Sequence, residues 1–287
     1  DPSYEGDGLK IKEIIKRGPF AVKKNEVTPG SIIEKIDGTD IKAGEDYNAL
    51  LDGKAGKNIR LTIKNAKGKR FDLTIKAISQ GAQQELLYKR WVDRNRAIVD
   101  SVSHGRIAYV HVKAMNSESF RTVYSELLSE KNRTKDAVIV DERHNGGGWL
   151  HDDLCTLLSG KQYQEFVPHG KVVGKDPFNK WTKPSCVLIC EDDYSNGHGF
   201  PWVYKELGIG KLIGAPVAGT MTAVWWETLM DRGLVFGIPQ VGCRDMRGTF
   251  GENTTLQPDI EVYNSPEDYI TGHDTQLIRA VEEMMKK

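Results

Sequence analysis

Apolar and polar residues alternate through most of the first part of the chain. Segments 8–15, 31–41 and 58–78 follow a two-residue period, and Pro-Gly, Asp-Gly and Lys-Gly dipeptides fall between or within them. A two-residue period places alternate side chains on one face of a strand, and these dipeptides favour turns. The pattern predicts a small β-rich domain over residues 1–81.

The pattern changes at residue 82, where apolar side chains take up helical spacing and predict a linker helix over 82–101. Beyond it, apolar strand-like segments alternate with helix-like ones: 106–112, 119–130, 136–143, 186–192 and 200–207. Such alternation is typical of an α/β domain with a mostly parallel central sheet. The second predicted domain therefore covers residues 82–287, the linker helix included.

Composition narrows the class of protein. The chain has 287 residues, enough for about two domains, and its 40 basic and 40 acidic residues give zero net charge. A nucleic-acid-binding protein needs a basic excess, so we expect no nucleic-acid partner. No run of 18 apolar residues occurs, so we expect no membrane insertion. The polar start carries no signal peptide, which favours the cytoplasm, although a trimmed terminus would look the same and leaves the periplasm open.

Four cysteines are too few for a disulfide framework. Cys186 and Cys190 fall in one apolar strand-like run, where small buried hydrophobic residues are expected. No Cys-x-x-Cys or Cys/His zinc spacing occurs, and the consecutive residues His151, Asp152 and Asp153 cannot converge on one ion. We therefore predict neither a metal nor another cofactor.

Three consecutive glycines, Gly146, Gly147 and Gly148, follow the predicted strand that ends near residue 143. Glycines let backbone N–H groups approach a ligand closely, and strand ends of α/β sheets gather function. The loop could hold an oxyanion or a phosphate, but neither the Walker A pattern nor G-x-G-x-x-G is present. A glycine-rich turn without chemistry is the alternative.

A serine lies at a second strand end. Ser195 stands between the strand of 186–192 and the following helix, where the free N–H groups of the helix start favour developing negative charge. Asn196 would offer a backbone N–H next to such a nucleophile, a common oxyanion donor. The alternative is that Ser195 only caps the helix.

Several motifs in order resemble the tricorn protease family over nearly the whole chain. VTPGSIIEKIDGTDI (27–41) is similar to the core of bacterial PDZ modules, and DERHNGGG (141–148) resembles the family's D-x-R-x-N-G-G-G loop. SNGHGF (195–200) resembles its nucleophile turn S-D-G-D-x-F. GENTTLQPDIEV (251–262) resembles its E-N-x-G-V-x-P-D-I-x-V stretch.

The resemblance implies a crotonase-like catalytic domain behind an N-terminal PDZ domain, acting on peptide substrates. It places Ser195 on the nucleophile and Glu252 on the glutamate that supports the catalytic histidine. Asn196 and Gly146–Gly148 fall on the oxyanion hole. Members of the family assemble into rings, so the full-length protein is expected to form homo-oligomers.

The chain departs from the family pattern at three positions. Asn196 and His198 replace two aspartates, and Thr255 replaces a glycine. A backbone N–H does not depend on the side chain, so Asn196 keeps its expected oxyanion role. Contacts that those side chains would make with a substrate do not carry over.

A serine nucleophile needs a base, and the family's histidine precedes its PDZ domain, in a stretch that this chain lacks. Among the seven histidines, His111 reads as a core residue, His144 and His151 as surface residues, and His198 follows the serine by three positions. No lysine occurs about 25 residues after Ser195, which argues against a Ser–Lys mechanism. We expect the base to come from a segment absent from this chain, so that the chain alone is inactive.

Three functions remain open from the sequence. The first is a serine peptidase of the tricorn type. The second is a peptide-binding scaffold with a degenerate catalytic domain, in which strand addition to the PDZ domain carries the function. The third is a crotonase-like acyl-thioester enzyme, which an assay with coenzyme A would reveal.

Overall fold

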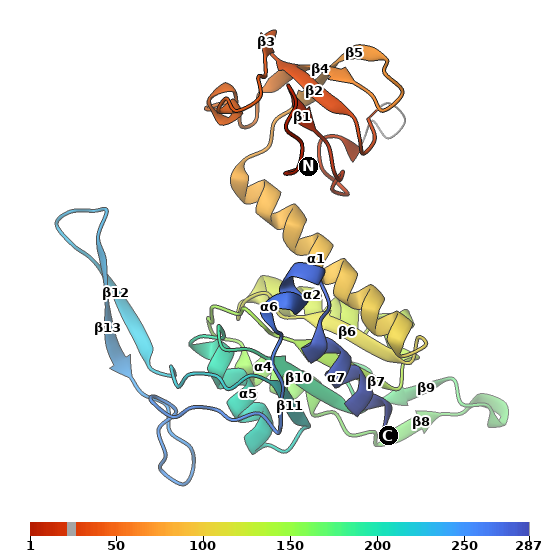
Figure 1. The fold of residues 1–287 in the computed structure, drawn as a ribbon. Coiled ribbons are helices and arrows are strands. Elements are labelled where there is room, and N and C mark those ends of the chain that lie inside the picture. The colour runs from red at the N-terminus through yellow and green to blue at the C-terminus, as the bar shows by residue number, and fades with distance from the viewer. Residues whose placement is uncertain (22–26, 287) are drawn as a thin grey trace. The chain divides into compact units, whose positions relative to one another are not determined.

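The computed structural model describes residues 1–21 and 27–286 and divides into two compact units, 1–94 and 95–287. The division falls inside helix α1 (Gln80–Val102), shown in yellow in Figure 1. The boundary predicted between residues 81 and 82 assigns the linker helix, residues 82–101, to the second domain. This boundary stays a prediction.

The N-terminal unit is built on one antiparallel sheet. Its strands are β1 (Leu9–Lys10), β2 (Ile32–Ile36), β3 (Thr39–Asp40), β4 (Asn58–Lys64) and β5 (Arg70–Lys76), and η2 (Tyr47–Leu50) is a single turn of 3₁₀-helix. In β4, the inward residues Ile59, Leu61 and Ile63 are buried and their neighbours are more exposed. The two-residue period read from the sequence is the period of this half-buried sheet.

The second unit contains a five-stranded parallel sheet in the order β14-β11-β10-β7-β6. Its strands are β6 (Ile107–His111), β7 (Ala137–Asp141), β10 (Ser185–Ile189), β11 (Lys211–Gly214) and β14 (Ile260–Glu261). Strands β6, β7 and β10 are buried along their whole length, which explains their continuous apolar sequences. The predicted α/β class with a parallel sheet is confirmed.

Helices cover both faces of this sheet (Figure 1). One face packs with α2 (Ser117–Leu127), α4 (His151–Leu158) and α5 (Asn196–Glu206) around alternate strand residues. Helix α7 (Thr275–Met285) lies against β7, β10 and β11. Burial of the sheet between helices makes it the rigid part of the unit.

Strands β7 and β10 are neighbours in this sheet and run in the same direction, with Val140 opposite Val187. Their carboxyl ends therefore meet at one edge. The loop after β7 carries the three glycines, and the loop after β10 carries Ser195. The topology thus brings together two segments that are about 50 positions apart in the sequence.

Two hairpins lie outside the main sheet, and the sequence reading did not anticipate them. The longer pairs β12 (Ala223–Thr228) with β13 (Val235–Val241), and the shorter pairs β8 (Gln164–Phe166) with β9 (Gly174–Asp176). Apolar side chains on both faces of the longer hairpin are exposed, among them Trp225, Trp226, Phe236 and Val241. The hairpin was not predicted because neither of its faces is buried, so its sequence lacks the apolar–polar alternation of a half-buried strand.

The remaining helical elements are short: α3 (Glu130–Arg133), η3 (Pro168–Gly170) and α6 (Pro266–Thr271). Ser265 caps α6 in a capping box with Asp268, which fixes the chain before α7. Across residues 1–21 and 27–286, no helix combines the length and the apolar character needed to cross a bilayer.

Candidate active site

Ser195 occupies the N-cap position of α5 in a backbone conformation that residues with side chains rarely adopt, φ 55° and ψ −118°. Its side chain makes no capping hydrogen bond, so the simple cap expected as the alternative is not its role. The Ser195 N–H donates to Thr220 Oγ1 at 2.9 Å, which helps to hold this conformation. A strained residue between strand and helix is typical of a nucleophile presented to substrate.

The first turn of α5 leaves one N–H group available beside Ser195. Gly197 N–H donates to Tyr194 O, and the N–H groups of His198 and Gly199 donate to Ser195 O. In the part of the chain that the structure describes, the Asn196 N–H has no such acceptor. It lies where a helix start favours negative charge.

The glycine loop packs directly on this turn. A Cβ atom added to Gly147 would lie 2.6 Å from Ser195 Cβ and 3.0 Å from Asn196 N, so only glycine fits there. The Gly147 N–H donates to Asn145 Oδ1 at 2.8 Å, and its carbonyl accepts from Met115 N–H. Because a trans peptide points C=O and N–H in opposite directions, the Gly148 N–H faces away from Met115.

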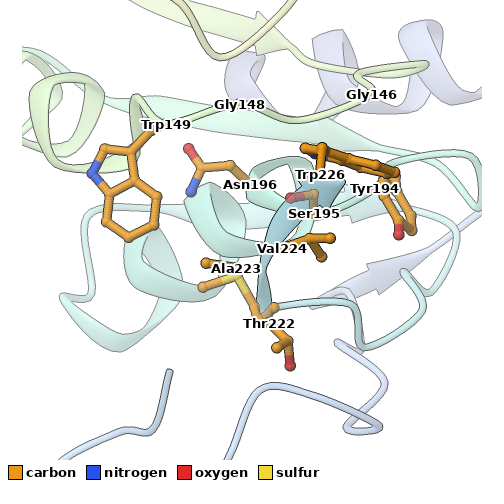
Figure 2. A pocket seen from close by; sticks show the side chains of 11 residues that line it. Gly146, Gly148, Trp149, Tyr194, Ser195, Asn196, Thr222, Ala223, Val224 and Trp226 are labelled. Carbon is orange, nitrogen blue, oxygen red and sulfur yellow. The ribbon is translucent and has the colours of Figure 1, made fainter. Parts of the chain in front are cut away.

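A pocket of about 350 Å³ opens at this junction, and Figure 2 shows Ser195 between Trp149 on one side and Trp226 with Tyr194 on the other. Gly146, Gly148 and Asn196 line it as well. Hairpin residues, Ala223, Val224 and Trp226, complete its wall. No acidic or basic side chain lines this pocket.

Glu252 lies beside the pocket but does not line it. Its Oε2 accepts a hydrogen bond of 2.8 Å from the N–H of Thr222, and Thr222 lines the pocket together with Ser195. The structure therefore brings Ser195, Glu252 and the glycine loop to one region, although they are far apart in sequence.

The side chain of Asn196 has a structural task that the sequence did not reveal. Its Oδ1 accepts from the N–H groups of Leu150 (2.8 Å) and His151 (3.1 Å), at the start of α4. Leu150, the N-cap residue of that helix, provides no side-chain cap. Asn196, buried to 3% exposure, therefore caps α4 from a different element.

We expect Asn196→Ala to lower the free energy of unfolding by about 1–2 kcal/mol, because α4 loses its cap. Asn196→Asp should lose less, since a carboxylate keeps the acceptor and is favoured at a helix N-terminus. Urea unfolding of the three proteins measures this difference. Equal losses for Ala and Asp would contradict the capping role.

The histidines around the site have other partners. His198 Nε2 lies 3.1 Å from Thr254 O, His151 Nδ1 lies 2.9 Å from the Asn196 amide nitrogen, and His144 Nδ1 lies 2.9 Å from Asp192 Oδ2. Burial lowers the pKa of His198, so this ring is neutral near pH 7. His111 is buried, as predicted, with Nε2 3.2 Å from Arg143 O. His144 is exposed, as expected of a surface residue, and His151 is half-buried.

Glu142, the residue after β7, is fully buried. Neither carboxyl oxygen has a hydrogen-bond partner among the described residues. Burial, reinforced by the nearby Asp193 and Asp141, raises the pKa of Glu142 well above its usual value. The carboxyl group is therefore protonated in the folded protein at neutral pH.

We expect Glu142→Gln to stabilise the protein at pH 7 and to have little such effect below pH 4.5. In the unfolded chain the carboxyl ionises near pH 4.3, whereas the folded protein keeps the proton. The contribution of Glu142 to the free energy of unfolding is thus fully present at low pH. It falls as pH rises above the unfolded-state pKa, by up to about 1.4 kcal/mol per pH unit. Unfolding free energies of both proteins at pH 4 and pH 7 test this, and a difference that does not change with pH would contradict it.

Three residues of the site escaped the sequence analysis. Asn145 belongs to the motif DERHNGGG. Its position just before the three glycines was a signal that its side chain could form a hydrogen bond with the loop. Thr220 and Trp226 come from a segment without a motif, and only the tertiary structure reveals their proximity to Ser195.

Comparison with known proteins identifies both units. Residues 4–80 match the tricorn protease PDZ domain. The chain is 29% identical to the tricorn protease of Thermoplasma acidophilum over 90% of its own length and 24% of that protein. It is 31% identical to a putative tricorn-like protease C-terminal subunit of Sulfurisphaera tokodaii, over 70% of this chain and 24% of the relative. The chain thus spans about a quarter of the length of these curated relatives.

A solved tricorn protease structure superposes on 98% of this chain and 27% of its own, with a TM-score of 0.83 and 26% identity. The predicted resemblance to tricorn proteases is thereby confirmed, together with an N-terminal PDZ domain and an α/β fold. The crotonase-like label stays a prediction. Residues 106–262, more than half of the chain, match the family model of peptidase family S41, and the protein belongs to that family.

Proposed function

We propose that this chain is part of a longer serine peptidase that hydrolyses peptide bonds with Ser195 as its nucleophile. The observation that carries the proposal is the strained Ser195 backbone at the start of α5, packed against Gly147 with only 2.6 Å of room for a Cβ atom. Membership of a peptidase family supports the same reaction class. An acyl-thioester enzyme would not need the N-terminal PDZ domain.

In this proposal the oxyanion hole consists of two backbone N–H groups. Asn196 N–H stands next to the nucleophile, and Gly148 N–H comes from the opposing loop. Gly147 N–H, which the sequence suggested, is already bonded to Asn145 Oδ1. Gly147 instead allows the close approach, and Gly146 provides a wall of the pocket. Such donors stabilise the charge that develops on the carbonyl oxygen.

The reaction would proceed in two steps. Ser195 Oγ attacks the peptide carbonyl carbon and gives its proton to a histidine, which passes it to the leaving amine. In the second step the same histidine takes a proton from water, which attacks the ester, and then returns the proton to Ser195 Oγ. We assign the histidine to a segment outside this chain and Glu252 to its support. The partners of His144, His151 and His198 given above favour a base from elsewhere.

Peptides are the proposed substrates, and the pocket favours apolar side chains near the scissile bond. Tyr194, Trp149 and Trp226 are more than half exposed around Ser195, and the lining carries no charge. Exposed aromatic rings bury large apolar area at low entropic cost when a ligand binds. No metal or cofactor takes part in this mechanism.

We also propose that the full-length protein forms homo-oligomers. The β12–β13 hairpin exposes large apolar side chains on both faces, and a two-stranded hairpin alone is marginally stable in water. Contact with a second subunit would cover such a surface.

The test is peptide hydrolysis by the full-length protein with and without Ser195→Ala. Activity that depends on Ser195 supports the proposal. A full-length protein that binds peptides but does not hydrolyse them would favour a scaffold role through the PDZ domain. Turnover of acyl-coenzyme A would favour the thioester enzyme.

A further inference from the structure

A cluster of three different side chains lies in the two loops that carry the three glycines and Ser195. His144 is the third residue after β7, Cys190 is the first after β10, and Asp192 is the third after β10. Their ligand-type atoms, one from each residue, lie within 4.8 Å of one another. This cluster was not predictable from the sequence, because 46 positions separate His144 from Cys190 and no zinc-type spacing joins them.

The distances in this cluster indicate convergence on one point. His144 Nδ1 lies 2.9 Å from Asp192 Oδ2 and 3.8 Å from Cys190 Sγ. Zinc bonds of about 2.0–2.3 Å in a tetrahedral arrangement separate the ligand atoms by about 3.3–3.8 Å. The His144–Cys190 pair already has this spacing, whereas Nδ1 and Asp192 Oδ2, which lie at hydrogen-bond distance, would move apart by a few tenths of an ångström when an ion binds.

The same distances argue against a Cys–His–Asp catalytic triad. In a triad the imidazole uses one nitrogen for the nucleophile and the other for the carboxylate. Here a single atom, His144 Nδ1, faces both Cys190 Sγ and Asp192 Oδ2. One nitrogen cannot serve both partners of a triad, whereas all three atoms can face a common ion.

We propose that His144 Nδ1, Cys190 Sγ and Asp192 Oδ2 bind a thiophilic divalent cation such as Zn²⁺. A thiolate, an imidazole and a carboxylate are the ligand types that Zn²⁺ takes, and the fourth position would hold water. On binding, the Cys190 thiol releases its proton to solvent, and His144 carries its remaining proton on Nε2. No electron transfer is involved.

The surroundings suit a cation at this place. The His144 and Asp192 side chains are about half and two-thirds exposed, which gives the ion a path from solvent. Cys190 is buried, and burial raises the pKa of its thiol well above the usual value. The His144 N–H, 3.2 Å from Sγ, and the cation together offset the cost of forming the thiolate.

A cation at this site would connect the two loops that build the proposed active site. Asn145, next to His144, accepts from Tyr194 N–H and donates its own N–H to Asp193 Oδ1. The same Asn145 fixes Gly147, and Tyr194 precedes Ser195. The ion would therefore lock the spacing between the glycine loop and the nucleophile turn, and raise the melting temperature.

The experiment is a titration of the metal-free full-length protein with Co²⁺, a spectroscopic substitute for Zn²⁺, followed by competition with Zn²⁺. We expect one Co²⁺ per chain with a thiolate-to-cobalt charge-transfer band, and a higher melting temperature when Zn²⁺ is added. Cys190→Ser should abolish the band. Asp192→Asn and His144→Asn should each weaken binding by at least about 10-fold.

His144→Asn keeps the fold, because asparagine tolerates the left-handed backbone of this position, φ 67°. His169→Asn is the matched control, as His169 is an exposed histidine with φ 50°. It should bind like the wild type. No charge-transfer band, or a band unchanged in Cys190→Ser, would overturn the proposal. None of these readouts depends on peptidase activity, so they stand or fall separately from the proposed function.

Discussion

Ser195→Ala in the full-length protein should lower kcat for peptide hydrolysis by about 10⁶-fold. The residual rate would come from substrate binding and the oxyanion donors, which the substitution leaves in place. Alanine keeps the Cβ atom, so the strained backbone of position 195 is no worse than before, and the folded state should persist. Hydrolysis of chromogenic peptides, with circular dichroism as the check of folding, measures the effect.

Ser125→Ala is the matched control, because Ser125 is an exposed serine on α2 whose hydroxyl donates to the neighbouring Thr122 carbonyl. It should leave kcat unchanged. The present chain alone should hydrolyse peptides slowly or not at all, since a nucleophile without its base stays protonated. An active Ser195→Ala protein would refute the nucleophile assignment. Rapid turnover by the isolated chain would move the base to one of its own histidines.

Gly147→Ala should lower kcat by about 10²–10³-fold, the loss associated with an oxyanion donor that is moved out of place. The new methyl group would lie 2.6 Å from Ser195 Cβ and 2.7 Å from Tyr194 O, so the loop and the nucleophile turn must separate. Position 147 also has φ 92°, which side chains rarely adopt, so the melting temperature should fall as well.

Gly146→Ala separates this effect from a general intolerance of the loop. A Cβ atom at Gly146 meets nothing within 4 Å, and its φ lies outside the positive region. Thermal unfolding of the two variants should therefore differ sharply, with the melting temperature of Gly146→Ala close to that of the wild type. Similar losses of melting temperature in both would mean that the close packing of Gly147 on Ser195 does not set the stability of this loop.

The sheet was predictable because its strands are buried on both faces. Strands β6, β7 and β10 are continuous apolar segments, and their alternation with helices leaves few topologies. The two strand ends followed from the same reasoning, since the carboxyl ends of neighbouring parallel strands share an edge. Local patterns thus singled out the glycine loop and Ser195 as candidates, whereas their roles came from the resemblance to the tricorn protease family.

Contacts between segments that are far apart in the sequence could not be predicted from it. The side chain of Asn196 caps α4, and only the packing of α5 on α4 puts it there. The choice of Gly148 N–H rather than Gly147 N–H depends on one hydrogen bond, which the Gly147 N–H donates to Asn145 Oδ1. The cluster of His144, Cys190 and Asp192 likewise exists only after β7 and β10 have paired.

The β12–β13 hairpin supplies one wall of the pocket, yet it belongs to no layer of the buried sheet. Trp226 and Val224 touch the proposed substrate space from a ribbon whose exchange would leave the parallel strands and their helices untouched. In the proposed peptidase, part of the substrate contact therefore comes from outside the segments that carry the nucleophile and the oxyanion donors, although Tyr194 and Trp149 beside those segments contribute to it as well. Substitutions in this hairpin would then alter the peptide preference during evolution without changing the nucleophile turn or the glycine loop.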